Sequence, residues 1–280
     1  MPVLDFILNC ACLLLWLNWR SQGLASPDRS PAMALISTLK RAEPGPRDSW
    51  TSPISLVSIL IVRAFIYWHA GPAAQWMPRI SLAAIVLHFR SDLFTRMLLF
   101  SLLNFLVFLA AFYFSLLLIA AVNRKTTPAN PWNAVVRAHL GIFARLPSWL
   151  CLLLPFIFTF LLWLALAPLL ASMKIHLPVK SFSQLCAQAA VIGLSGWLFW
   201  PYVIAAILLL HIISSYVYFG NAPFWHFINT TARGLLRPVA WLPLRVGKVD
   251  FTPLLTLGLL ALIILFAPRG LAWLYGRFHA

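Results

Sequence analysis

The polar side chains inside the long apolar stretches are the first candidates for chemistry. His211 stands in an uncharged stretch, and a histidine at membrane depth can be an axial ligand of haem. A haem held by two histidines needs a second one at matching depth, but the other histidines stand at the ends of apolar stretches or between them. We therefore predict that His211 bonds to a neighbouring backbone carbonyl, that Asn104 is a helix-packing residue, and that the protein binds no cofactor.

Catalytic and metal-binding patterns are missing from the sequence. It contains no phosphate-binding, dinucleotide-binding, zinc-protease or nucleophile-elbow motif, and only six acidic residues. Cys10 and Cys12 point to nearly opposite faces of a helix, so they fit neither a metal pair nor a disulfide framework. The remaining cysteines are Cys151 and Cys186. We expect neither enzymatic activity nor a metal site.

The elements that must hold these residues are membrane helices. The chain is 62% hydrophobic and 10% charged, with a mean hydropathy of +0.88. A membrane helix needs about 20 apolar residues, and six stretches approach that length. They are residues 3–19, 54–68, 97–122, 149–171, 197–219 and 251–268. The composition predicts an all-α polytopic membrane protein with about six transmembrane helices.

Three charge features refine this prediction. Asp5 lies near the start of the first stretch, which we interpret as a retained anchor because no basic region precedes it and no small-residue cleavage site follows. Arg63 lies close to the end of the second stretch, so we expect its side chain to reach the headgroups without a buried partner. The net charge of +15 is scattered between apolar stretches, which favours anionic lipid headgroups over nucleic acid as the partner.

The stretches can be grouped as three copies of a two-helix hairpin. The copies occupy residues 1–70, 97–173 and 197–268, and the first is degenerate. Residues 71–96 form an interfacial or re-entrant connection, 174–196 a connection rich in small residues, and 269–280 an interfacial tail. Proline opens the second helix of each hairpin, and we predict Ser52 and Thr252 as N-caps.

Two connections inside the hairpins are amphipathic. At helical spacing, one apolar face collects Phe224, Phe227, Ile228, Thr231 and Leu235, opposite His226, Arg233 and Arg237. The second connection repeats this arrangement with Trp132, Val135, Val136, Leu140 and Phe143 opposite Arg137 and Arg145. Such a helix either lies in the plane of the headgroups or packs on the rest of the protein, and both interpretations stay open.

The basic residues also predict an orientation. The connections inside the three hairpins carry thirteen Lys and Arg residues, and the opposite side carries seven. Positively charged connections stay in the cytoplasm. We therefore expect the hairpin connections inside the cell and both termini outside.

The segment before the last apolar stretch resembles the signature of the YggT family, called YlmG in Gram-positive bacteria. The resemblance covers residues 197–268 and rests on two spaced prolines, a glycine and an Asp-x-Thr-Pro run. The matching residues are Arg237, Pro238, Pro243, Gly247, Asp250, Thr252 and Pro253. It implies a bacterial inner membrane protein built from two-helix units, with structural roles for these residues.

The resemblance also implies a class of function. Relatives are linked to membrane organisation, osmotic tolerance and assembly of membrane cytochromes, which favours a non-enzymatic scaffold or assembly factor for other membrane proteins. The alternatives are a transporter or channel for small solutes or ions, and a haem or cytochrome assembly factor. Asp250 either holds the connection in shape through charged hydrogen bonds or meets the dipole of the following helix.

Overall fold

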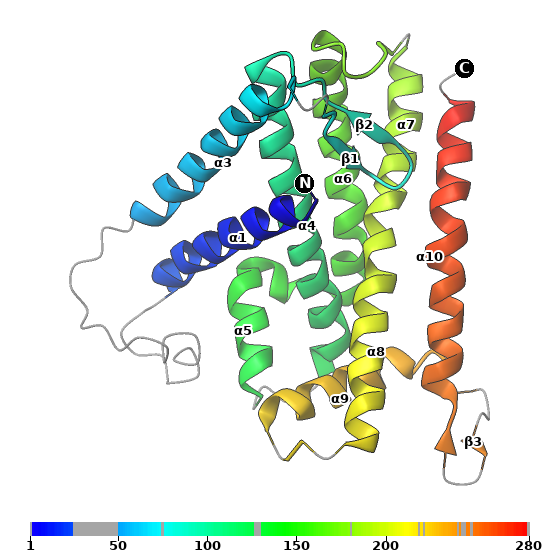
Figure 1. Ribbon diagram of the computed structural model, residues 1–280. Helices are drawn as coiled ribbons and strands as arrows, with labels where there is room; N and C mark the ends of the chain where they lie inside the picture. The colour runs from blue at the N-terminus through cyan, green and yellow to red at the C-terminus, as the bar shows by residue number, and fades with distance from the viewer. Residues whose placement is uncertain are drawn as a thin grey trace. The chain divides into compact units, whose positions relative to one another are not determined.

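The computed structural model is built mainly from long helices (Figure 1). It describes residues 2–24, 50–73, 76–125, 130–179, 181–217, 219–220, 222–239, 241, 245–246 and 249–278. Six helical stretches are long and apolar enough to cross a membrane. They are Val3–Ser21, Thr51–Ala70, Phe94–Val122, Ser148–Ser172, Phe182–Tyr216 and Thr252–Arg277. The predicted helical membrane protein is confirmed at this level.

The chain divides into two compact units. Unit 1 contains residues 1–80 and 88–112, and unit 2 contains residues 81–87 and 113–280. Unit 1 is built from α1 (Pro2–Leu24), α3 (Thr51–Ala70) and the first part of α4 (Phe94–Val122). Its apolar core contains one residue of α1, two of α3 and one of α4: Cys12, Leu56, Leu60 and Phe105. Cys12 is therefore a packing residue.

The predicted connection 71–96 contains a two-stranded sheet. Strand β1 (Arg79–Ser81) pairs with β2 (Val86–His88), and α4 begins soon afterwards at Phe94. Aromatic side chains pack at the ends of this connection, with Trp76 4.6 Å from Tyr67 and Phe89 5.5 Å from Phe100 between ring centroids. The apolar run here is too short for a membrane helix, and six residues of this connection form the two strands.

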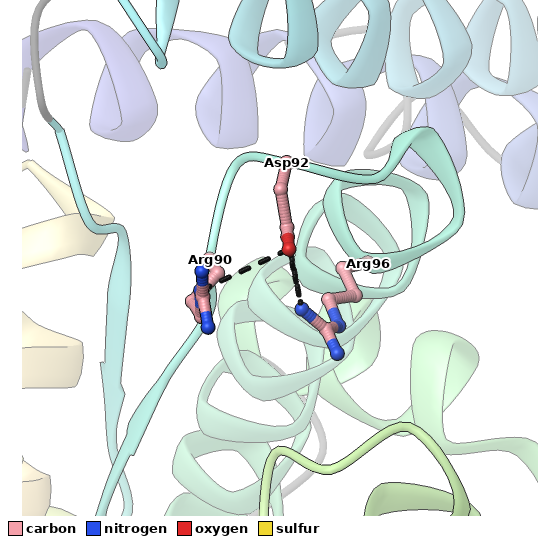
Figure 2. A network of polar contacts seen from close by, with 3 residues as sticks. All are labelled: Arg90, Asp92 and Arg96. Atoms are coloured by element: carbon pink, nitrogen blue, oxygen red, sulfur yellow. Dashed lines mark hydrogen bonds and ion pairs between the residues drawn. The ribbon is translucent and has the colours of Figure 1, made fainter.

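Charged side chains gather at the start of α4. Asp92 accepts hydrogen bonds of 2.9 and 3.0 Å from Nη1 of Arg96, one helical turn later, and lies 3.8 Å from Nε of Arg90 (Figure 2). A carboxylate just before a helix also meets the positive end of the helix dipole. This small network lies at the point where α4 begins.

Unit 2 is dominated by helices that run side by side. Helix α6 (Ser148–Ser172) packs on α7 (Phe182–Ser195), which continues through the short 3-10 helix η4 (Gly196–Phe199) into α8 (Trp200–Tyr216) (Figure 1). Together α7, η4 and α8 form one helical stretch of 35 residues. Most of the connection predicted at 174–196 is therefore helix, and it forms the most extensive helix contact of α6.

The amphipathic connections form α5 (Pro131–Leu140), extended by η3 (Gly141–Arg145), and α9 (Pro223–Leu236). The apolar face of α9 packs along α8, and Trp132 of α5 contacts Phe224 of α9 at 5.5 Å between ring centroids. On the predicted apolar face of α5 and η3, Val136 and Leu140 are buried, but Trp132 and Phe143 are exposed. Phe227, Ile228 and Thr231 are buried, whereas Arg233 and Arg237 are exposed, as the helical spacing predicts. For α9 the contacts support packing on the protein, whereas for α5 and η3 both interpretations stay open because part of the apolar face is exposed.

A buried amide joins three of these elements. Asn123, in the short 3-10 helix η2 (Asn123–Lys125) after α4, donates a hydrogen bond of 2.7 Å to Oγ1 of Thr231 on α9. Its amide nitrogen also lies 3.4 Å from Oδ1 of Asn133 on α5. Bonds of this kind hold the amphipathic helices against the end of α4.

The predicted N-caps are wrong. Trp50 occupies the cap position of α3 and Phe251 that of α10 (Thr252–Arg277), while Ser52 and Thr252 lie inside the first turn and are buried. The hydroxyl of Ser52 instead accepts a hydrogen bond of 2.9 Å from the amide of Asn18 on α1. The hydroxyl therefore joins two helices, which a cap bond within its own helix would not do.

The last helix is longer than predicted. Helix α10 follows an antiparallel pair of two-residue strands, β3 (Arg245–Val246) and β4 (Val249–Asp250), and continues through Pro268 to Arg277. The predicted interfacial tail is thus largely the end of this helix. The guanidinium of Arg277 lies 4.2 Å from the centre of the Trp273 ring, a cation–π contact suited to a membrane boundary.

Candidate functional site: a buried arginine between three helices

The residues of the YggT-like signature surround the connection between α9 and α10. Arg237 and Pro238 are exposed just after α9, and Thr252 and Pro253 are buried in the first turn of α10. The backbone of Asp250 pairs with Arg245 in the strand pair. The other two signature residues, Pro243 and Gly247, lie outside the described residues. These positions give the described part of the signature a place in the chain, at the end of α9 and the start of α10.

The strongest candidate site in the structure is the one around Arg63. The prediction that this side chain reaches the headgroups is wrong, because the residue is only 1% exposed. It lies in α3, seven residues before the helix ends at Ala70. A buried arginine inside a membrane helix is costly unless its donors find partners, and such residues often mark function.

All three nitrogens of the Arg63 guanidinium donate hydrogen bonds to neighbouring helices. Nη1 donates to Oδ1 of Asn9 on α1 at 2.8 Å, and Nε donates to Oγ of Ser101 on α4 at 2.9 Å. Nη2 donates to the backbone carbonyl of Ser101. The Ser101 hydroxyl in turn donates to the carbonyl of Leu60 at 2.8 Å. The planar fork of arginine suits this arrangement, since it serves two partners in different directions.

A second polar pair lies one turn along the same helices. The hydroxyl of Tyr67 donates to Oδ1 of Asp5 at 2.7 Å, again between α3 and α1. The Asp5 carboxylate also interacts electrostatically with Arg63. The direct hydrogen-bond partners of Arg63 that the structure gives are nevertheless neutral. The site therefore places a positive charge in a low-dielectric interior, balanced at longer range by the Asp5 carboxylate.

The number of residues between each polar side chain and its helix end is the signal that could have predicted these pairs. Asn9 lies seven residues after the start of α1 at Pro2, and Arg63 lies seven before the end of α3. Asp5 and Tyr67 lie three residues from those same helix ends. In an antiparallel helix pair such residues lie at the same level. Hydropathy alone does not reveal this match, because it treats each stretch separately.

Removing the Tyr67 hydroxyl is expected to weaken the pairing of α1 with α3. Tyr67→Phe leaves Asp5 without this donor while keeping the aromatic ring against Trp76, so we expect a loss of about 1 kcal/mol of unfolding free energy. Denaturation of the detergent-solubilised protein, followed by circular dichroism, measures the change. An unchanged unfolding midpoint would contradict a structural role for the hydroxyl.

His211 has a side-chain partner where a backbone carbonyl was predicted. Its Nδ1 lies 2.7 Å from Oδ1 of Asn229 on α9, and the same oxygen accepts from the Ser214 hydroxyl at 2.7 Å. The amide of Asn229 thus ties α9 to α8. Among the residues that the structure describes, no group of three or more His, Cys, Asp and Glu side chains is placed to hold a metal ion.

The fold and these sites define a multi-pass α-helical membrane protein in which polar side chains join neighbouring helices. No family model matches the chain, and no match is found among the curated proteins or the solved structures.

Proposed function

We propose that this protein is a non-enzymatic scaffold or assembly factor for other proteins of a bacterial inner membrane, as its YggT-like signature implies. In this proposal its helices form three related hairpins, the hairpin connections face the cytoplasm, and anionic headgroups bind the scattered basic residues. The exposed position of Arg237, just after α9, is the observation that carries it. An arginine in that position is free to meet a partner's acidic side chain or a lipid phosphate.

The use of polar groups inside the helices supports this proposal. Arg63 bonds to Asn9 and Ser101, and His211 bonds to Asn229, so both side chains form hydrogen bonds to neighbouring helices. A helix bundle held in this way offers partners a stable surface. The scarcity of acidic residues leaves little material for acid–base chemistry.

Crosslinking in native membranes tests the scaffold. A tagged chain is expected to capture specific membrane proteins, and Arg237→Ala to lower their yield roughly tenfold, because an interface arginine commonly contributes more than 1 kcal/mol. Arg277→Ala is the matched control, since Arg277 lies at the end of α10 and stacks on Trp273. Recovery of the chain alone, or equal yields from both variants, would refute the scaffold.

A second candidate function, transport of a small anion, is favoured by the charge of Arg63. Its guanidinium has five N–H groups, and its direct hydrogen bonds go to Asn9 and Ser101, which are neutral. An anion reaching this depth would gain a charge-assisted hydrogen bond.

Flux measurements separate the two functions. If the chain transports anions, liposomes containing the purified protein will release chloride or phosphate faster than empty ones, and Arg63→Met will abolish the difference. Arg63→Lys keeps the positive charge, and we expect this variant to retain part of the faster ion release. Sealed vesicles would exclude transport of these ions and leave the scaffold proposal standing.

A further inference from the structure

Two fully buried polar side chains of unit 2 have no partner in the part of the chain that the structure describes. Gln188 on α7 is 0% exposed, and neither its amide nitrogen nor its amide oxygen makes a hydrogen bond there. Trp163 on α6 is 1% exposed, and its indole N–H is likewise unbonded. An unsatisfied buried polar group costs about 1–3 kcal/mol, so two adjacent ones call for an explanation.

The packing of α6 on α7 places these two residues at the same level. The helices are antiparallel, since Trp197 Nε1 donates to the Leu152 carbonyl at 2.8 Å and Thr159 Oγ1 to the Gly193 carbonyl at 3.1 Å. Trp163 follows Thr159 by four residues on α6, and Gln188 precedes Gly193 by five residues on α7. In an antiparallel pair these two steps lead in the same direction. At about 1.5 Å per residue, their levels differ by little more than one residue.

Both side chains also face α10. The Trp163 ring lies 6.3 Å from the ring of Tyr275, a buried residue near the end of α10. Gln184 donates to the carbonyl of Phe278 at 2.8 Å, and Gln188 follows Gln184 by one turn on the same face of α7. The two unbonded groups therefore converge at the junction of α6, α7 and α10.

Two further polar side chains, His176 and Tyr275, lie beside this junction. Nδ1 of His176 lies 2.7 Å from the carbonyl of Leu177, which only accepts, so Nδ1 carries a proton. Nε2 of the same ring lies 2.8 Å from the Tyr275 hydroxyl. His176 also packs against the Trp163 ring, at 5.5 Å between centroids. Neither Trp163 nor Gln188 carries a formal charge, so an ion bound by these two side chains would lose its hydration without a counter-charge.

We propose that the junction of α6, α7 and α10 binds an uncharged molecule through a hydroxyl group, either water or a small polyol. The hydroxyl oxygen accepts from Trp163 Nε1 and from the Gln188 amide nitrogen, and its proton goes to the Gln188 amide oxygen. One such molecule satisfies all three unbonded groups, because a hydroxyl both donates and accepts. The site is independent of the function proposed above.

Nuclear magnetic resonance of the full chain in detergent, with ¹⁵N-labelled tryptophan, tests the site. The chain has thirteen tryptophans, and Trp163→Phe identifies the Trp163 indole signal by its disappearance. Bound water is expected to give an exchange or Overhauser cross-peak to this N–H, and glycerol titration leaves the signal unchanged. A bound polyol is instead expected to shift the signal saturably during the titration. A Trp163 signal with neither response would overturn the proposal.

One further variant, with an internal control signal, shows whether Gln188 takes part. Gln188→Met is expected to shift the Trp163 indole signal and to abolish its response to water or glycerol. The indole of Trp149, which is 63% exposed on the same helix α6, serves as the control and is expected not to change. An unaltered Trp163 response in Gln188→Met would refute a shared site even if the variant is less stable than the natural chain.

Discussion

Asn9→Leu is expected to destabilise the protein by about 2–3 kcal/mol, because it removes an acceptor from the buried Arg63 charge. Arg63→Met should cost less, since it removes the charge together with its desolvation cost. The double variant should lie within about 1 kcal/mol of the natural chain, because replacing both partners with apolar groups leaves neither unsatisfied. The order of these three stabilities is the specific prediction.

Denaturant titration in mixed micelles, followed by circular dichroism, measures the three free energies. A double-mutant cycle then isolates the coupling between the two side chains. Arg63→Lys extends the series, because a single ammonium lacks the fork that reaches both Asn9 and Ser101. Strictly additive losses, or an Asn9→Leu variant as stable as the natural chain, would show that the hydrogen bond contributes nothing.

Gly196→Ala is expected to cost about 1–3 kcal/mol by forcing α6 away from η4. A Cβ at Gly196 would lie 2.8 Å from the backbone carbonyl oxygen of Pro155 and 2.8 Å from the Thr159 hydroxyl. The carbonyl belongs to the α6 backbone and cannot rotate aside. The displacement would also stretch the bond from Thr159 to the Gly193 carbonyl. Small residues allow this close approach of helices in lipid.

Gly258→Ala provides the matched control. Nothing lies within 4 Å of a Cβ at Gly258, which is inside α10. Alanine there should stabilise the helix by up to about 1 kcal/mol through its higher helix propensity. Thermal unfolding of both variants in the same detergent measures the contrast. If the Gly196 variant is as stable as the Gly258 variant, α6 and η4 are not closely packed.

The sequence predicts the membrane helices well, because hydropathy integrates over whole stretches. Residues 97–122 and 149–171 correspond closely to Phe94–Val122 and Ser148–Ser172. The faces of α9 also follow from helical spacing, as the burial of Phe227 and the exposure of Arg233 show. Both properties depend on residues that are close in the chain. The grouping of the helices into repeated hairpins stays a prediction.

Partners that are distant in the chain are harder to predict. Arg63 was expected to reach the headgroups because nothing near it in the sequence reveals Asn9 and Ser101 as acceptors. Helix α7 was missed because its glutamine and serine residues lower the hydropathy, although Gln188 is fully buried. The hydroxyl of Ser52 does not cap α3 as the sequence predicts, because it accepts a hydrogen bond from Asn18 on the neighbouring helix α1. In each case tertiary contacts outweigh the local pattern.

The stretch Phe182–Tyr216 has 35 residues and, at 1.5 Å each, measures about 52 Å. The oily interior of a bilayer is about 30 Å thick, and a tilt of about 20° lengthens the path through it by only a few ångströms. Roughly a third of this rod must stand beyond the acyl chains. Because α6 and α10 pack on α7 and α9 packs along α8, this excess length is accompanied by neighbouring helices at its ends. Limited proteolysis from each side of the reconstituted membrane will show how the excess is divided between the two surfaces.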